Sequence, residues 1–307
     1  MLKEVIIFVI GCLVLVKSAE YTVRSIVHLA RAIRLTEFVT SFILVAVVAA
    51  LPDAFISITS AISGNAPLGV GTLLGGNIAD LTLILGLVAL AGNPIRIHSS
   101  IVKKDLYFAA LAILPIMLGV DGQISRLDGI ILLSAGIIFL LVLLKERQYF
   151  TKPYKNGNFV VKNTFIFFAS IAVMLVSAHF IVESGTSLAV MLNVPSILLG
   201  AVLLGLGTTL PEFMFSLQSI RKGHADLAIG DLLGNVVIDS CILMGIVALI
   251  APISIELVTW GALGIFTAFS MAFALIFMRS DGILSKNEAM ALILFYVAFV
   301  VTQIFLR

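Results

Sequence analysis

The chain has 307 residues, of which 61% are hydrophobic and only 12% are charged, and its mean hydropathy is +1.18. A soluble domain of this length does not have such a composition, so the sequence predicts an integral membrane protein. The net charge of +2 says little about partners; the basic segment 145–162 is interpreted as a cytoplasmic connector, and no nucleic-acid partner is expected.

Apolar runs predict about ten transmembrane helices, because most of the runs approach the roughly 20 residues that cross a bilayer as a helix. The runs are continuous, whereas the strands of a membrane barrel alternate, so we expect an all-α polytopic membrane protein. In chain order the runs lie near residues 5–16, 38–62, 68–92, 106–120, 129–144, 164–182, 196–220, 227–252, 255–278 and 289–306.

The distribution of Lys and Arg predicts the orientation of the chain. If the N-terminus is outside, 16 of the 19 basic residues fall in inside loops, in agreement with the positive-inside rule. We therefore expect a multi-pass protein of the cell membrane with both termini extracytoplasmic. Membrane lipid surrounds it, and a monomer is the expected state.

The chain contains an internal repeat. A shift of 159 residues superposes Pro52 on Pro211, and residues 64–90 match 223–249 at 12 of 27 positions. Each copy holds about five spans, an odd number, so the second copy must enter the membrane upside down. We therefore expect two inverted five-helix repeats, 1–144 and 163–307, joined by the cytoplasmic linker 145–162.

Each copy carries a Leu-Pro-acid step inside an apolar run, "LPDAF" at 51–55 and "LPEFM" at 210–214. Proline removes a backbone donor, so we expect both helices to break at the midplane and release carbonyl oxygens. The carboxylates predicted at membrane depth are Asp53, Asp80, Glu212 and Asp239. Unpaired carboxylates are costly there and repel one another, so an occupied site must hold cations or protons.

Neutral oxygens in the same stretches indicate the kind of cation. Thr208 and Thr209 offer hydroxyls, and Asn235 offers an amide oxygen one turn before Asp239. Such hard oxygen ligands suit Ca²⁺ better than a soft metal. Asp231 has two interpretations, a cytoplasmic access residue or a carboxylate at the start of a helix, and the second is favoured.

At "GTTLPE" (207–212), followed by "GDLLGNVVID" (230–239), the chain resembles the calcium/cation antiporter superfamily, in particular its sodium/calcium exchanger branch. The resemblance covers the whole chain and implies that Asp53 and Glu212 are central ligands of Ca²⁺ and Na⁺. The metal-site residues taken together are Asp53, Asp80, Glu212, Asp239, Thr208, Thr209, Asn235, Ala49 and Gly76.

Three positions depart from the pattern of that family. Ala49 and Ala50 stand where such exchangers usually carry Thr and Ser, and Gly76 replaces a frequent Ser. Three hydroxyl ligands are therefore missing, although the backbone carbonyls of the two alanines could serve instead. Asp80 supplies a carboxylate where an Asn is common, and carboxylates can take protons, so coupling to H⁺ stays open beside coupling to Na⁺.

These features favour a secondary active antiporter, not an enzyme, that moves Ca²⁺ in exchange for Na⁺ by alternating access and uses no cofactor. The outer spans, roughly 1–30 and 163–188, would slide or rock past the bundle that holds the site. Three alternatives are weighed: an H⁺-coupled exchanger of the same fold, a passive cation channel, and an intramembrane aspartyl protease. The protease is disfavoured because "AIGD" (228–231) lacks the first glycine of the Gly-x-Gly-Asp step.

Overall fold

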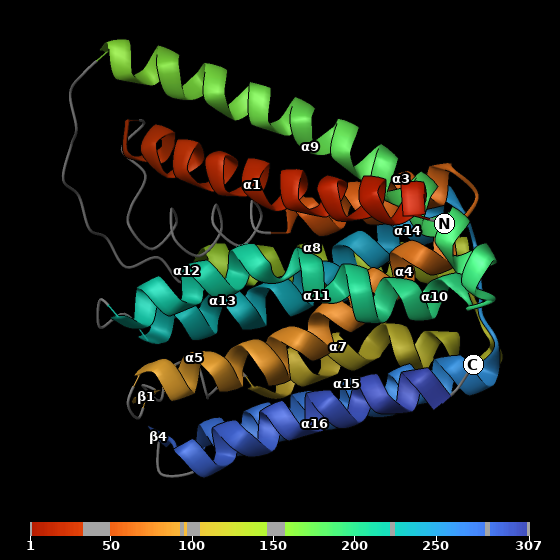
Figure 1. Cartoon of the computed structure of the whole chain (residues 1–307). Helices are drawn as coiled ribbons and strands as arrows, with labels where there is room; N and C mark the ends of the chain where they lie inside the picture. The colour runs from red at the N-terminus through yellow and green to blue at the C-terminus, as the bar shows by residue number, and fades with distance from the viewer. Residues whose placement is uncertain are drawn as a thin grey trace.

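The computed structural model describes residues 2–32, 50–92, 95–96, 105–145, 157–221, 225–279 and 283–305, and most of them are helical (Figure 1). Six helical segments in this part of the chain are long and apolar enough to cross a membrane. They are Ala66–Ala91, Val161–Leu192, Ser196–Arg221, Ala228–Ile250, Leu257–Arg279 and Lys286–Phe305. The chain is therefore a multi-pass helical membrane protein, as predicted, while the count of ten spans stays a prediction.

The first half of the chain contributes eight described helical segments. They are α1 (Leu2–Ala32), α3 (Leu51–Ile62), α4 (Ala66–Ala79), η2 (Asp80–Ile84), α5 (Leu85–Gly92), α7 (Asp105–Leu118), η3 (Gly119–Asp121) and α8 (Arg126–Lys145).

The second half begins with a long helix, as the first half does. Its helices are α9 (Gly157–Leu192), α10 (Ser196–Leu199), η4 (Gly200–Leu204), α11 (Gly205–Thr208), α12 (Leu210–Arg221), α13 (Ala225–Val237), η5 (Ile238–Leu243), α14 (Met244–Ile250), α15 (Leu257–Arg279) and α16 (Lys286–Phe305).

Three of these segments, η2, η4 and η5, are π-helices inside otherwise α-helical rods. A π-turn holds one residue more than an α-turn, and such turns occur often at functional sites. Two of the three lie at matched places in the two halves: η2 begins at Asp80, and η5 contains Asp239 as its second residue. The local winding of the helix therefore changes where these carboxylates stand.

Reciprocal hydrogen bonds of the same kind fix the start of α8 and of α16. The Ser125 N–H donates to Asp128 Oδ2 (2.8 Å), and the Asp128 N–H donates to Ser125 Oγ (3.3 Å). Ser285 and Glu288 make the same two bonds, of 2.8 and 3.3 Å. Each pair satisfies N–H groups that the first helical turn leaves without an acceptor, so a short polar sequence determines where each helix begins.

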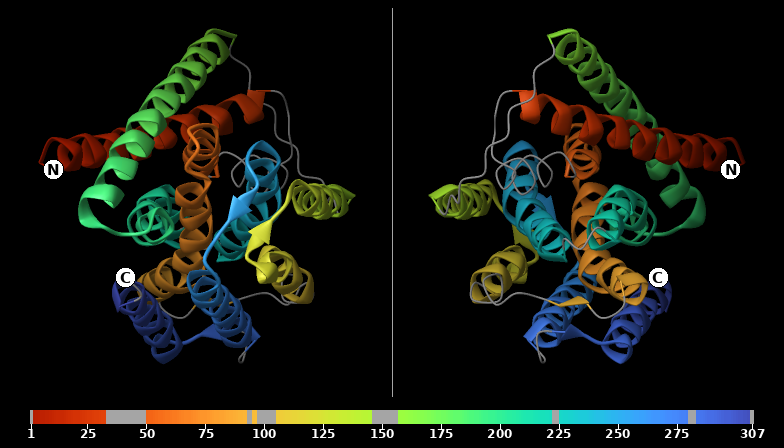
Figure 2. Two further views of the ribbon diagram at one scale, coloured as in Figure 1. Left: turned by 90° about the vertical axis from the view of Figure 1, so that its right-hand side faces the viewer. Right: turned by 90° about the vertical axis from the view of Figure 1, so that its left-hand side faces the viewer.

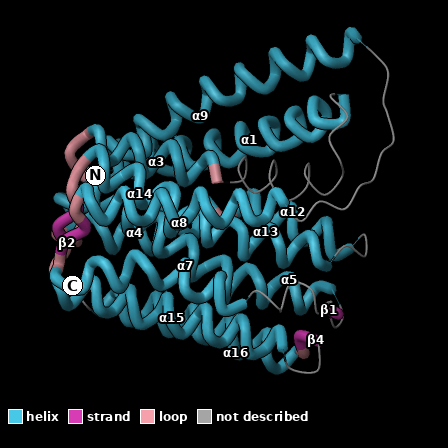
Figure 3. Tube along the Cα trace, turned by 180° about the vertical axis from the view of Figure 1, so that it is seen from behind, coloured by secondary structure: helices cyan, strands magenta, loops and turns pink. Residues whose placement is uncertain are grey.

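Two very short antiparallel strand pairs connect the halves. The strand β1 (Ile95–Arg96) pairs with β4 (Ile283–Leu284), and β2 (Gln123–Ile124) pairs with β3 (Ile253–Ser254). The first pair lies at one end of the helices and β2 lies at the other end (Figure 3). Each pair therefore joins a strand from the first half to a strand from the second, once at each end.

The helices α1 and α9 cross each other on one side of the molecule, outside the bundle that the other helices form (Figure 2). Thr22 Oγ1 of α1 donates to Ser170 Oγ of α9 across 2.8 Å. Large apolar side chains cover their outward faces, for example Leu13 and Phe165, which are 64% and 75% exposed. Such faces suit contact with lipid. Both chain termini lie at the same end of the molecule (Figure 1).

Small residues bring the backbones of α4 and of the segment α10–η4 into close contact. A Cβ atom on Gly71 would lie 2.0 Å from the carbonyl oxygen of Ile197, and one on Gly75 would lie 2.0 Å from that of Ala201. No side chain fits at either position. The glycines therefore set the distance between a helix of the first half and a helix of the second, as small residues do between membrane helices.

Candidate functional site

The four carboxylates predicted at membrane depth all lie inside the protein. Asp53 stands in the first turn of α3, Asp80 at the start of η2, Glu212 in the first turn of α12, and Asp239 in η5. All four side chains are 0% exposed. When ionised, Asp53 would repel both Asp80 and Asp239, and Asp80 would repel Glu212, so the structure brings acids from both halves into one electrostatic cluster.

The carboxylates of this cluster accept almost no hydrogen bonds. Of its eight carboxylate oxygens, seven accept no hydrogen bond, and the exception is Asp80 Oδ2. No Lys, Arg or His among the described residues forms an ion pair with any of the four acids. Burial of a carboxylate without a donor or counter-charge is costly, so the arrangement suits a bound cation or protons.

Two amides connect the helices on which Asp80 and Asp239 stand. Asn235 Nδ2 of α13 donates to Asp80 Oδ2 across 3.0 Å, and Asn77 Nδ2 of α4 donates to Ser240 Oγ of η5, also across 3.0 Å. Both hydrogen bonds run from one half of the chain to the other. Asn235 Oδ1 remains without a donor, which leaves it available as a cation ligand.

The break beside Glu212 is a single residue wide. The helix α11 ends at Thr208, Thr209 is a turn residue, and α12 begins at Leu210. The Thr208 hydroxyl donates to the carbonyl oxygens of Leu204 (3.1 Å) and Gly205 (3.2 Å), and the Thr209 hydroxyl donates to that of Leu206 (3.0 Å). A hydroxyl that donates a hydrogen bond keeps two lone pairs on its oxygen, so Thr208 and Thr209 can still bind a cation.

The predicted site residues that lack functional side chains behave differently from one another. A Cβ atom on Gly76 would lie 3.8 Å from Thr209 Cγ2 and 4.0 Å from Asp53 Oδ2, which are ordinary contacts. The Gly76 carbonyl accepts the Asp80 N–H and is therefore already hydrogen-bonded. Gly76 thus contributes space to the site and not a ligand. The Ala50 carbonyl accepts the Ala54 N–H (2.9 Å), and Ala49 lies outside the described residues.

Carboxylates alone would not hold a metal ion in this conformation. No group of three or more His, Cys, Asp and Glu side chains in the described ranges is arranged to bind one. Ca²⁺ takes about six to eight oxygens, and hydroxyls, amides and carbonyls can supply part of them. A bound Ca²⁺ would therefore depend on the free oxygens of Thr208, Thr209 and Asn235 as well as on the acids.

The interpretation of Asp231 as a carboxylate at the start of a helix is wrong. The helix α13 begins at Ala225, so Asp231 lies beyond its first turn. Its side chain is 1% exposed, and neither carboxylate oxygen accepts a hydrogen bond. When ionised, Asp231 would repel Asp80 and Glu212. The signal in the sequence was its spacing of four residues from Asn235, which puts both on one helical face.

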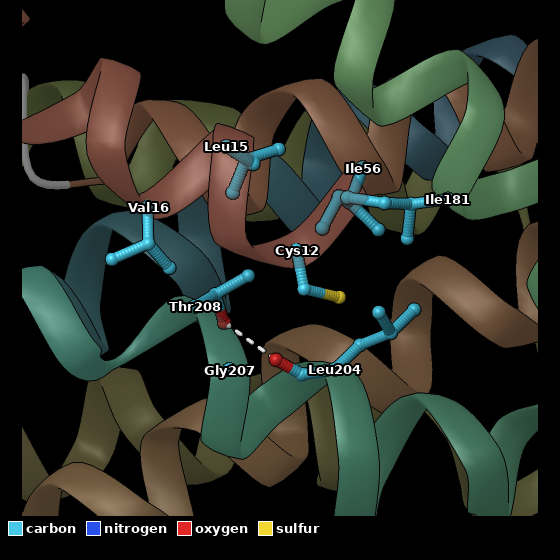
Figure 4. A pocket seen from close by; sticks show the side chains of 8 residues that line it. All are labelled: Cys12, Leu15, Val16, Ile56, Ile181, Leu204, Gly207 and Thr208. Atoms are coloured by element: carbon cyan, nitrogen blue, oxygen red, sulfur yellow. Dashed lines mark hydrogen bonds between the residues drawn. The ribbon is translucent and has the colours of Figure 1, made fainter. Parts of the chain in front are cut away.

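An apolar crevice separates the outer helices from the site (Figure 4). It is too narrow to hold a water molecule, and α1 supplies Cys12, Leu15 and Val16 to its lining. The opposite wall includes Gly207 and Thr208 of α11. Apolar side chains of α1 therefore lie directly over a predicted cation ligand.

Comparison with known proteins identifies the family of the chain. The model of the family described as sodium/calcium exchanger protein matches residues 3–145 and 162–305. The chain is 29% identical to the inner membrane protein YrbG of Escherichia coli over 272 residues, which cover 83% of this chain and 82% of that protein. It is 25% identical to the sodium/calcium exchanger MaX1 of Methanosarcina acetivorans over 98% of both chains. A crystal structure of an H⁺/Ca²⁺ exchanger, CAX, has the same fold with a TM-score of 0.79 at 14% identity, over 98% of this chain and 86% of that one.

Proposed function

Because the chain belongs to the sodium/calcium exchanger protein family, we propose that it is a secondary active antiporter that moves Ca²⁺ across the membrane in exchange for Na⁺. Asp53, Asp80, Glu212 and Asp239 form the shared site, and Thr208, Thr209 and Asn235 complete it with neutral oxygens. The observation that carries the proposal is the burial of these four acids with seven free oxygens.

Exchange follows from competition for the same oxygens. The empty site carries up to four negative charges in a place without counter-charges, and it would be costly to move across the membrane in that state. Ca²⁺ or the counter-ions neutralise it. Only a loaded site then changes its exposure from one face to the other, which couples the two fluxes without a separate gate.

The duplicated features of the fold support an inverted repeat of two five-helix halves, 1–144 and 163–307, with the connector 145–162. The strand pairs lie at opposite ends of the molecule, as expected if one half is upside down relative to the other. The reciprocal caps of α8 and α16 and the π-helices at Asp80 and Asp239 recur in both halves. The common end of the two termini agrees with both being extracytoplasmic.

Motion of α1 and α9 would provide alternating access. These helices lie outside the bundle, and α1 meets the site helices through the apolar lining of the crevice. Apolar surfaces make few directional bonds, so a helix can shift along them at small cost. A displacement of α1 would uncover Thr208 toward one face.

Coupling to H⁺ is the second candidate. Ala50 and Gly76 provide no hydroxyl where Na⁺ would need one, and Asp80 adds a carboxylate that can carry a proton. Both candidates use the same site and the same alternating access, and they differ in which gradient drives Ca²⁺. Transport measurements distinguish them directly.

The experiment is Ca²⁺ counter-flow in proteoliposomes, with the Na⁺ and pH gradients varied independently. A Na⁺ gradient is expected to drive Ca²⁺ uptake at constant pH, whereas uptake that follows the pH gradient alone would assign H⁺ as the counter-ion. Glu212→Gln is expected to abolish uptake, because it keeps the size of the side chain and removes the charge. Glu183→Gln is the matched control, since the Glu183 side chain on α9 is 67% exposed and does not belong to the buried cluster.

Normal uptake by Glu212→Gln would show that the site is assigned wrongly. Passive flux of Ca²⁺ without any counter-ion would identify a channel in place of an exchanger.

A further inference from the structure

Asp231 is a fifth carboxylate inside the membrane-spanning part, and exchange at the four-acid site does not require it. Both of its oxygens are buried without a hydrogen-bond donor, and its side chain is 1% exposed. Among the described residues no cationic side chain pairs with it. A negative charge held in this way is costly unless a cation visits it.

Asp231 lies on the way from the four-acid site to one face of the protein. It is six residues from the first residue of α13, which corresponds to about 9 Å along the helix, and eight residues, about 12 Å, from Asp239. The helix α13 begins at the end of the molecule opposite to the two termini (Figure 1). Asp231 thus stands between that face and the central acids.

Asn235 lies between Asp231 and Asp239 along the chain. It is four residues from each, so Asp231 and Asn235 share one face of α13 about 6 Å apart, and Asp239 follows about 6 Å further along in η5. The Asn235 amide nitrogen is occupied by Asp80, which leaves Asn235 Oδ1 buried and without a donor. The carboxylate oxygens of Asp231 and Asp239 are likewise without donors. Free oxygen ligands therefore continue along this face beyond the four-acid site.

The first half of the chain has no counterpart of this carboxylate. Thr72 occupies the matched position on α4, and its hydroxyl donates to the Leu68 carbonyl of its own helix across 2.9 Å. Thr72 is fully buried and its hydroxyl is already hydrogen-bonded, so it offers the site no free carboxylate oxygen. The two halves consequently differ in charge on one side of the site only.

We propose that Asp231 forms a transit site for the transported divalent cation, between the four-acid site and the face at which α13 begins. This inference rests on the proposed exchange of Ca²⁺. A cation that arrives from that face binds Asp231 first, passes Asn235 Oδ1, and reaches Asp80 and Asp239. On the route from the opposite face, Thr72 stands at the matched position and offers no carboxylate.

The test is the KM for Ca²⁺ measured separately at the two faces, with right-side-out and inside-out membrane vesicles. Asp231→Asn is expected to raise KM about tenfold, equivalent to roughly 1.4 kcal/mol, at the face where α13 begins and to leave KM at the other face unchanged. Asp231→Thr, which introduces the residue of the matched position, is the second variant and should have the same one-sided effect. Thr72→Val, which removes only a hydroxyl bonded to its own helix, should change neither KM.

The double variant Asp231→Thr with Thr72→Asp moves the carboxylate to the matched place in the other half. If the halves are inverted, the lower KM should then appear at the opposite face. Wild-type KM values at both faces of Asp231→Asn would overturn the inference, and so would an equal rise at both faces, which indicates a long-range charge effect. In either case, loss of uptake in Glu212→Gln would still support the proposed exchange, whereas normal uptake in Glu212→Gln would refute the exchange site itself.

Discussion

Replacement of Gly75 by alanine would place a methyl group in the backbone of the neighbouring helix. The added Cβ atom would lie 2.0 Å from the Ala201 carbonyl oxygen and 2.4 Å from Ala201 Cα, whereas real Cβ contacts essentially never fall under 3.0 Å. The helix α4 and the segment η4 must therefore separate by about 1 Å. Because the obstacle is backbone and cannot rotate away, the cost should be near the upper end of overpacking, about 3 kcal/mol.

The separation should also impair transport, because Gly76 and Asp80 follow on the same rod as Gly75. A shift of about 1 Å in ligand positions can cost up to roughly 100-fold in a rate that depends on geometry, so we expect Ca²⁺ uptake to fall at least tenfold. The assays are thermal unfolding of the purified protein in detergent and initial Ca²⁺ uptake in proteoliposomes.

Two other glycines are matched controls for this change. Gly261→Ala adds a Cβ atom that meets nothing within 4 Å, and Gly76→Ala adds one that makes contacts of 3.8 to 4.0 Å. Both should be at least as stable as the original protein, since alanine favours a helix over glycine by about 0.5–1 kcal/mol. If Gly75→Ala unfolded at the same temperature as Gly261→Ala and transported normally, the close contact between α4 and η4 would be refuted.

Three further changes test the site and a helix start. Asp80→Asn retains an acceptor for the Asn235 amide but removes a charge, so we expect a folded protein with about tenfold weaker Ca²⁺ binding by calorimetry; unchanged affinity would exclude Asp80 as a ligand. Gly76→Ser fits sterically and brings a hydroxyl toward Asp53. This variant should strengthen the dependence of Ca²⁺ release on external Na⁺. If the Na⁺ dependence stayed as in the original protein, the idea that a hydroxyl ligand for Na⁺ is missing at Gly76 would be contradicted. Ser285→Ala removes the cap of α16 and should cost about 1 kcal/mol, seen as a lower unfolding temperature, while an unchanged temperature would mean that the cap contributes nothing.

The four acids of the site could be found from sequence because each signal was strong by itself. Asp53 and Glu212 follow a proline inside apolar runs, and Asp80 and Asp239 match after the 159-residue shift. An acid in such surroundings is rare enough to indicate function. The structure brings these four residues together in the interior, although the sequence contained no direct information on their distances.

Other features depend on contacts that a sequence pattern does not contain. The π-helices at Asp80 and Asp239 have no residue signature, because they arise from how the rods pack. The hydrogen bonds from Asn77 and Asn235 run between residues more than 150 positions apart. Asp231 was misinterpreted because the start of α13 was placed nearer to it than the structure shows. Helix ends are the least certain part of such predictions.

The crossed strand pairs imply that neither half of the chain is a complete protein. A fragment that ended in the connector would keep β1 and β2 with unpaired edges, because the partners β4 and β3 both belong to the other fragment. It would also expose Gly71 and Gly75 of α4, which pack against the backbone of α10 and η4. Two separately made fragments, inserted in opposite orientations, could restore every one of these contacts without a covalent link. If the two halves are inverted, as proposed above, the chain has the design of an antiparallel dimer whose two subunits have become one polypeptide.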